Sequence, residues 1–304
     1  MEEGAANACP LPSFTLNELM RLLLLLFFPL ITIGQKNCEG FIVDKITGNR
    51  IPYATVGLIK ENKGVSADEQ GVFSINSSFP KIDSLRISSV GYKTQVLPVS
   101  EWANGSVIAL EQEPGLLGEV VVSANRQKQI YTLNSFRHCS SNWYQLGPET
   151  FYQIAQRFEA PQPGMQLTDL ELCKDQSASI FRLRMYDVDS VNQGPSRDLA
   201  DTVIEIRSRE KHIRVDLEKY NIIIPGKGFF VAVEWLFIPF NEEQEKFKVR
   251  GRKSVHILYK PFIRYVTNRN TPKGNVWLQH FNGKWAEIYA SCQNQNFQIT
   301  IKLR

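Results

Sequence analysis

The stretch GFIVDKITGNRIPYATVGL, from Gly40 to Leu58, decides the fold of the first part of the chain. It begins with an apolar run that ends at Val43, turns at Thr47-Gly48, and continues with a second apolar run. Short apolar runs broken by glycine, asparagine and aspartate are typical of β-strands joined by turns. The pattern continues to Leu110 with no helical period, and it predicts a β-sandwich of about seven short strands.

Three motifs of this region resemble a known domain family. They are the opening stretch, GVSADEQGVFSI (Gly64–Ile75) and LRISSVGYKT (Leu85–Thr94), and they occur in this order. Together they are similar to the carboxypeptidase regulatory-like domain, a transthyretin-like sandwich, and we assign residues 35–112 to it. The resemblance implies an accessory module with no catalytic role and no zinc site. The turn from Asp68 to Gly71 lacks the alternating oxygen ligands of a calcium loop, so we expect no metal there.

The N-terminus has the features of a secretory signal peptide. Arg21 precedes an apolar run of about a dozen residues that ends in small ones. Because residues 1–19 carry three glutamates and would make a poor positive region, we expect the true start at Met20 and cleavage near Gly34. Residues 1–34 are thus predicted to export the chain to the periplasm, outer membrane or cell surface. An uncleaved signal anchor is the alternative.

Removal of this leader would leave four of the five cysteines. They are Cys38, Cys139, Cys173 and Cys292. In an exported protein they can form disulfides, and four cysteines allow three complete pairings between which the sequence does not choose. Isolated buried thiols are an equal alternative. The wide spacing excludes a CxxC redox or zinc motif.

The segment GLLGEVVVSANRQ, from Gly115 to Gln127, resembles the entrance to the plug of a TonB-dependent outer-membrane receptor. Such a receptor needs a plug followed by about 22 strands of about ten residues each. Residues 128–304 are too few for both. We therefore predict that residues 113–130 form a linker. The resemblance then implies a protein of the Gram-negative cell envelope without a plug or barrel.

Residues 131–304 again show short strand-like segments and no convincing helix. From Phe181 to Tyr186, apolar residues alternate with two arginines and a tyrosine, as in a strand with two different faces. The run from Phe229 to Trp235 is strongly apolar and is expected at the centre of a sheet, with Trp235 in the core. An Asn282-Gly283 turn between apolar segments predicts a β-hairpin. These features predict a jelly-roll-like sandwich and an all-β chain.

Two stretches of this second part carry a further resemblance. They are FRLRMYDVDSVNQGPSRDL (residues 181–199) and VDLEKYNIIIPGKGFFVAVEW (residues 215–235). Both are similar to the galactose-binding-like jelly-roll regions that follow regulatory-like domains in envelope proteins. The resemblance implies a binding or structural domain and names no ligand.

Linear motifs for catalysis, cofactors and metals are missing. No histidine has a glutamate three residues on or another histidine within five residues, so no zinc peptidase site is expected. The histidines are His138, His212, His256 and His280. Ser78-x-x-Lys81 and Ser208-x-x-Lys211 lack the companion motifs of a serine nucleophile. We predict a protein that is not an enzyme and has no cofactor, and a hydrolase without a linear motif is the alternative.

Four residues are candidates for ligand binding. Asp187 and Asp189 form an acidic cluster after a predicted strand, which suits either a ligand loop or a turn in solvent. Trp277 and Trp285 flank the predicted hairpin turn, where aromatic faces suit sugars but also suit core packing.

The net charge of +4 is small and does not indicate a nucleic-acid-binding protein. In the basic stretch from Lys246 to Lys253, charged residues alternate with Phe247 and Val249. This pattern predicts an edge strand with one solvent-exposed face and one buried face. The expected partner is an envelope protein or a glycan, and peripheral outer-membrane association is a further hypothesis. The sequence thus predicts a non-catalytic, exported binding or scaffolding module. An accessory component of a TonB-dependent uptake system is an alternative.

Overall fold

The structure is a computed structural model. It describes residues 37–76, 83–113, 129–147, 151–249, 252–268, 274–288 and 295–304. These residues form β-strands and the short 3-10 helices η1 (Val99–Glu101), η2 (Glu218–Tyr220) and η3 (Pro239–Asn241), with no α-helix among them. The predicted all-β fold class is therefore confirmed. The predicted leader and most of the predicted linker lie outside the described residues. Within the described part, no helix is long and apolar enough to cross a membrane.

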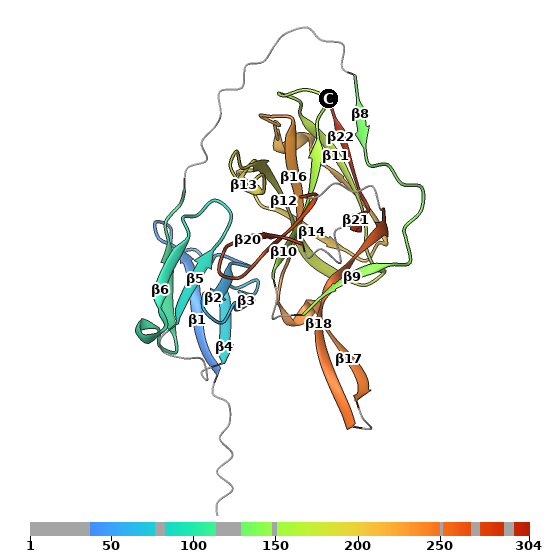
Figure 1. Cartoon of the computed structure of the whole chain (residues 1–304). Helices are drawn as coiled ribbons and strands as arrows, with labels where there is room; N and C mark the ends of the chain where they lie inside the picture. Colours follow the sequence, from blue (N-terminus) through green and yellow to red (C-terminus); the bar gives the residue numbers. More distant parts are fainter. Residues whose placement is uncertain are drawn as a thin grey trace, which may run out of the picture. The chain divides into compact units, whose positions relative to one another are not determined.

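The first seven strands form two sheets, drawn from blue to green in Figure 1. One has the order β4-β1-β7 and consists of β1 (Asn37–Asp44), β4 (Val72–Asn76) and β7 (Ser106–Leu110). The other has the order β3-β2-β5-β6 and consists of β2 (Thr55–Leu58), β3 (Lys63–Ser66), β5 (Ser84–Ser88) and β6 (Gln95–Pro98). β1 is antiparallel to β4 and parallel to β7.

Alternate residues of these strands form the core of the N-terminal sandwich. Ile42 and Phe73 from one sheet share a buried cluster with Val56 and Ile87 from the other. Since successive side chains of a strand point to opposite faces, the apolar alternation in the sequence is sufficient to fill the space between the sheets. The predicted seven-stranded N-terminal sandwich is confirmed.

Asp44 fixes the end of β1. Its Oδ1 accepts hydrogen bonds from the backbone N–H groups of Ile46 and Thr47, both at 2.8 Å. Its Oδ2 accepts hydrogen bonds from the Tyr92 hydroxyl at 3.0 Å and from Gln112 Nε2 at 2.6 Å. These bonds, with that of Thr47 foremost, hold the pKa of the Asp44 carboxyl well below its ordinary value. Asp44 thus connects the first turn with the last residues of the sandwich.

A second sandwich follows (Figure 1). Its main sheet has the order β13-β12-β16-β10-β19-β20, and β14 also pairs with β12. The strands are β10 (Gln153–Glu159), β12 (Ser179–Val188), β13 (Pro195–Asp198), β14 (Ile204–Ser208), β16 (Gly228–Trp235), β19 (Val276–Gln279) and β20 (Trp285–Glu287). A smaller sheet, with the order β15-β11-β22-β8, shares its core. Its strands are β8 (Tyr131–Leu133), β11 (Leu167–Cys173), β15 (His212–Asp216) and β22 (Ile299–Leu303).

A third sheet has the order β17-β18-β21, and β9 also pairs with β18. Its strands are β9 (Trp143–Leu146), β17 (Glu242–Val249), β18 (Arg252–Thr267) and β21 (Gln295–Phe297). Among the described residues β17 pairs only with β18, and Lys246 and Lys248 on it are exposed. The predicted edge position is confirmed, whereas the side chains of Phe247 and Val249, which would form the buried face, lie outside the described ones.

Two further sequence predictions hold in this second sandwich. β16 lies between β12 and β10, and Trp235 at its end is fully buried, as expected for a central strand. β19 and β20 form the predicted hairpin, with Leu278 opposite Ala286. Gly283 in its turn has a φ of +86°, a conformation that favours glycine.

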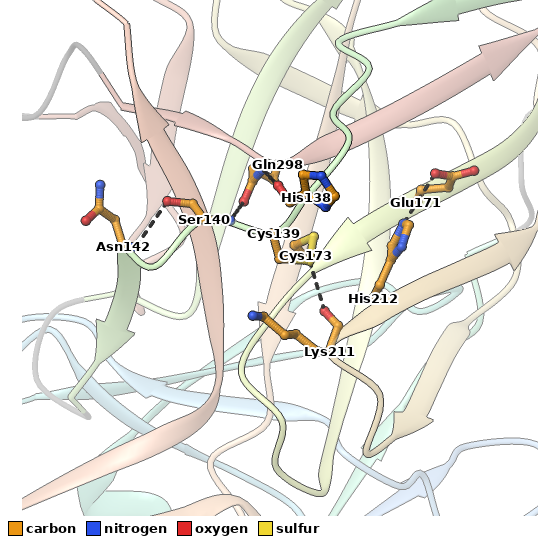
Figure 2. Close-up of a disulfide and its surroundings, with 9 residues drawn as sticks. All are labelled: His138, Cys139, Ser140, Asn142, Glu171, Cys173, Lys211, His212 and Gln298. Atoms are coloured by element: carbon orange, nitrogen blue, oxygen red, sulfur yellow. Dashed lines mark hydrogen bonds and ion pairs between the residues drawn. A yellow bond between two sulfur atoms is a disulfide. The ribbon is translucent and has the colours of Figure 1, made fainter.

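Within the described residues one disulfide forms, between Cys139 and Cys173 (Figure 2). It joins the segment between β8 and β9 to the end of β11, with 5.6 Å between the two Cα atoms. Beside it, Gln298 Oε1 accepts a hydrogen bond from the Ser140 N–H at 2.5 Å. The structure therefore selects one pair among the alternatives that the sequence leaves open.

Candidate functional site

The main sheet of the second sandwich carries charged side chains on the face opposite its core. In β12 the residues at 181, 183 and 185 enter the core, so Arg182, Arg184 and Tyr186 project from the other face. Glu234 of β16 projects from the same face, because it lies opposite Arg182 in the strand register. Two of these charged residues are nevertheless buried, since Arg182 and Glu234 are each only 2% exposed.

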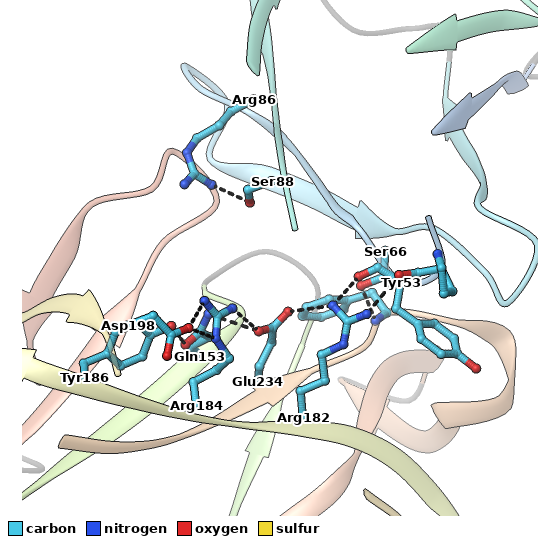
Figure 3. Close-up of polar contacts among 12 residues, drawn as sticks. Tyr53, Ser66, Arg86, Ser88, Gln153, Arg182, Arg184, Tyr186, Asp198 and Glu234 are labelled. Carbon is cyan, nitrogen blue, oxygen red and sulfur yellow. Dashed lines mark hydrogen bonds and ion pairs between the residues drawn. The ribbon is translucent and has the colours of Figure 1, made fainter. Parts of the chain in front are cut away.

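Arg182 connects this face to the N-terminal sandwich. Its Nη1 donates to the carbonyl of Tyr53 at 3.0 Å and its Nη2 to that of Pro52 at 2.9 Å (Figure 3). Tyr53 has a φ of 56°, a left-handed conformation that costs a non-glycine residue about 1–2 kcal/mol. The hydrogen bonds from a buried guanidinium offset this cost. The Tyr53 side chain also packs in a buried cluster with Ile180 and Leu236.

Two carboxylates balance the two arginines. Glu234 Oε1 lies 3.7 Å from Arg182 Nη1, and Glu234 Oε2 lies 2.8 Å from Arg184 Nη1. Arg184 Nη2 lies 2.5 Å from Asp198 Oδ2. A buried charge is tolerated when it is paired and hydrogen-bonded, and this network has as many negative as positive groups. We call Arg182, Arg184, Asp198 and Glu234 the charge network.

Aromatic and amide groups continue the charge network along the sheet. The Tyr186 hydroxyl donates to Gln153 Oε1 at 2.8 Å, and Gln153 Nε2 donates to Glu234 Oε2 at 3.3 Å. Burial raises the pKa of Tyr186 well above its ordinary value, although Arg184 opposes this, so the phenol stays a neutral hydrogen-bonding group. The Trp285 ring meets the Tyr186 ring edge-on, with 5.3 Å between the centroids.

A cavity of about 310 Å³ lies between the N-terminal sandwich and this face of the main sheet. The N-terminal sandwich contributes Arg86 and Ser88 of β5, together with residues 89–92. The second sandwich contributes part of the charge network and the side chains of Gln279 and Trp285. Small-molecule sites have volumes of about 300–1,000 Å³, so this cavity suits a small polar ligand.

Two groups in the cavity wall have unused binding capacity. Arg86 Nη1 donates to Ser88 Oγ at 3.0 Å, but within the described residues no carboxylate forms an ion pair with Arg86. Gln279 Nε2 donates to the carbonyl of Gly283 at 3.3 Å, whereas its buried Oε1 accepts no hydrogen bond from the described residues. A buried acceptor without a donor costs about 1–3 kcal/mol, which a ligand hydroxyl would recover.

The acidic pair predicted from the sequence lies outside this cavity. Asp189 Oδ1 accepts hydrogen bonds from the N–H groups of Val191 and Asn192, at 2.8 and 2.9 Å, which lower the pKa of its carboxyl. Asp187 Oδ2 lies 3.6 Å from Arg197 Nη2. Asp189 thus organises a turn through backbone N–H groups, and Asp187 forms an ion pair between β12 and β13. Across the described residues, no group of three histidines, cysteines, aspartates or glutamates could hold a metal ion.

The structure separates the roles of the two tryptophans. Trp285 lines the cavity, as described above. Trp277 does not line it: its Nε1 donates to the carbonyl of Gly274 at 3.0 Å, and its ring lies against Gly194 in the loop after Asp189. The structure thus brings Trp277 close to the acidic loop, and only Trp285 reaches the cavity.

Sequence reasoning did not find the other cavity residues. Among them are Arg86, Gln153, Arg184, Tyr186, Glu234 and Gln279. One signal for them is present, because Glu234 interrupts the apolar run of β16 and a glutamate is rarely buried without a partner. The alternating arginines of β12 supply that partner, but only the strand register shows that they meet.

Comparisons with known proteins agree with the first resemblance. Residues 38–122 match the family model of the CarboxypepD_reg-like domain, so the N-terminal sandwich is a domain of this kind. No curated protein matches the chain.

Two of the solved structures that show similarity to the chain contain the same protein. One contains the cysteine protease and lectin-like domains of Cwp84, a surface layer associated protein of Clostridium difficile. The match has 19% sequence identity and a TM-score of 0.33, and it covers 50% of this chain and 32% of the Cwp84 chain. The other is the clostridial cysteine protease Cwp84 after propeptide cleavage, with 12% identity and a TM-score of 0.40 over 76% of this chain and 53% of that one. The chain thus spans about a third and about half of these two chains.

Proposed function

We propose that the chain is a non-catalytic, exported binding module of the cell envelope, and that its ligand is a glycan held in the cavity between the two sandwiches. The composition of the cavity wall carries this proposal. It combines charged and amide groups with the aromatic side chains of Tyr186 and Trp285. Sugars present hydroxyl donors and acceptors beside apolar C–H faces, and such a wall complements both.

The size of the cavity suits a small ligand. Its volume of about 310 Å³ lies at the lower end of the range of small-molecule sites, which is about 300–1,000 Å³. A sugar at the end of a chain is small enough to enter it.

The arrangement of the two carboxylates favours binding over hydrolysis. Glycoside hydrolysis uses one carboxylic acid that carries a proton and a second carboxylate across the scissile bond. Asp198 and Glu234 both form ion pairs with the Arg184 guanidinium. The carboxylates therefore organise the wall of the cavity, and we assign them no catalytic step.

The disulfide supports the proposed export. Disulfides persist in oxidising compartments and are rare in the reducing cytosol. Cys139 and Cys173 are bonded, and Cys173 is fully buried. N-terminal sequencing of the mature protein should show cleavage near Gly34.

A glycan array with the mature chain tests the binding proposal. We expect a restricted set of glycans to bind, and we expect Trp285→Ala to weaken that binding about tenfold, or about 1.4 kcal/mol. Trp143 is the matched control because it is 51% exposed, contacts Arg264, and does not line the cavity. Trp143→Ala should bind as the wild type does.

Two outcomes would contradict the proposal. If no glycan binds, or if both tryptophan variants bind like the wild type, the cavity is not a glycan site. If bound glycans are cleaved and Asp198→Asn abolishes the cleavage, the chain is a hydrolase.

A further inference from the structure

We infer that the cavity selects an acidic sugar, whose carboxylate pairs with Arg86 while one of its hydroxyls donates to Gln279 Oε1. This inference rests on the proposed glycan-binding function and specifies its ligand class. It starts from two groups in the cavity wall, Arg86 and Gln279, whose binding capacity the protein itself uses only in part.

Arg86 belongs to the N-terminal sandwich but reaches the second one. A Cβ built on Gly283 would lie 2.8 Å from Arg86 Cζ, so the guanidinium lies against the turn between β19 and β20. Burial raises the pKa of Tyr152, another residue of the cavity wall, and the nearby charge of Arg86 opposes this rise. Figure 3 shows Arg86 and Ser88 apart from the charge network, and Arg86, Arg184, Asp198 and Glu234 all line the cavity. A ligand in the cavity would therefore have the Arg86 guanidinium on one side.

The charges around the cavity leave Arg86 without a counter-ion. The charge network is neutral, since Arg182 and Arg184 are balanced by Glu234 and Asp198. The remaining acid in the wall, Glu113, is exposed and acts on Lys93, whose pKa it helps to raise.

A carboxylate is the anion that fits this balance. The planar guanidinium of an arginine matches a carboxylate with two parallel hydrogen bonds. A phosphate monoester would bring a second negative charge close to Asp198 and Glu234, which line the same cavity. A monoanion with its charge spread over two oxygens avoids most of that repulsion.

Gln279 supplies the second recognition element. The side chain is 9% exposed and its Oε1 has no donor among the described residues, while its Nε2 is held by the Gly283 carbonyl. The amide is therefore oriented, and its free capacity is for a hydrogen-bond donor. A sugar hydroxyl is such a donor, whereas a bare inorganic anion is not.

The test compares acidic sugars with their methyl esters, which keep every hydroxyl but replace the charged carboxylate by a neutral ester with one extra methyl group. The probes are glucuronate-, galacturonate- and sialate-terminated oligosaccharides, each with its methyl ester, together with the matching neutral and phosphorylated oligosaccharides. Titration calorimetry on the mature chain should show at least one acid binding about tenfold or more tightly than its ester, because hydrogen bonds to charged groups are the strong ones.

Variants at Arg86 assign that preference to a residue. Arg86→Gln should bring the acid down to the affinity of its ester, and Arg86→Lys should restore part of the difference. Arg214→Gln is the matched control, since Arg214 also lies on a strand but is exposed and pairs with Asp169 of the neighbouring strand, in a sheet that contributes no residue to the cavity. Gln279→Leu should weaken acid and ester alike. Melting curves of each variant check that the chain still folds.

The outcomes separate this inference from the proposed function. If glycans bind but no acid is preferred to its ester, or if Arg86→Gln keeps the preference, the inference is wrong and the glycan proposal stands. Tighter binding of the phosphorylated probes would also overturn it. If none of the probes binds and the glycan array is silent, both proposals fail.

Discussion

Loss of the disulfide between Cys139 and Cys173 should destabilise the chain by about 4 kcal/mol. The two cysteines are 34 residues apart in the sequence. In the chain-entropy model, a crosslink that closes a loop of this length removes about 12.6 cal/mol/K from the unfolded state, or about 3.8 kcal/mol at 25 °C. The perturbation is the double variant Cys139→Ala/Cys173→Ala, and the assay is urea unfolding followed by tryptophan fluorescence.

The control is Arg137→Ala, an exposed change in the same segment, which should cost less than about 0.5 kcal/mol. Non-reducing peptide mapping of the wild type should recover the linked pair. A loss below about 1 kcal/mol in the double variant, or a different pair in the map, would refute the reasoning, because the crosslink would then not constrain the unfolded chain as calculated.

Three more predictions concern the interior of the chain. Glu234→Gln should lower the free energy of unfolding by about 3–5 kcal/mol because two buried arginines lose a counter-ion. Glu243→Gln, at an exposed position of β17, should change it by less than about 0.5 kcal/mol in the same urea experiment. Gly57→Ala should lower the melting temperature, since the new Cβ would lie 2.5 Å from the Phe281 carbonyl oxygen. Gly147→Ala should leave the melting temperature unchanged, because its Cβ would lie 3.8 Å from the nearest atom. Equal melting curves for the two variants would contradict the close packing at Gly57. The pKa of the Asp44 carboxyl is lower in the folded state than in the unfolded state. Its carboxylate therefore stabilises the fold fully above the unfolded-state pKa of about 4. This stabilisation is lost as the pH falls from about 4 through the pKa of the folded state. The stability difference between the wild type and Asp44→Asn should thus be constant near neutral pH and shrink below about pH 4, and a difference that grows on acidification would show the opposite sign.

The sequence alone was enough for the local architecture. Turn residues and a period of two in the stretch from Gly40 to Leu58 predicted the N-terminal sandwich, and an apolar run predicted the central strand β16. Asn282-Gly283 predicted the hairpin of β19 and β20. These features succeed because strand alternation and turn conformation are decided by residues that are neighbours in the chain.

The candidate site could not be predicted in this way. The sequence indicated Asp187, Asp189, Trp277 and Trp285, and of these only Trp285 lies in the cavity. Asp187 lies at the end of β12 and Asp189 begins the turn that follows, and the composition of this stretch resembles that of a ligand loop because the same side chains satisfy backbone N–H groups in both. The leader and the linker remain predictions from the sequence.

Only the tertiary structure decided which distant residues meet. The sequence showed that Arg182 and Arg184 face away from the core of their own sheet, but not that the carbonyls of Pro52 and Tyr53 cover that face. Likewise, it offered Cys139 several partners and did not indicate Cys173. Strand periodicity fixes which face of a strand a side chain occupies, whereas the partner across that face depends on how whole sheets pack, and that information is spread over the entire chain.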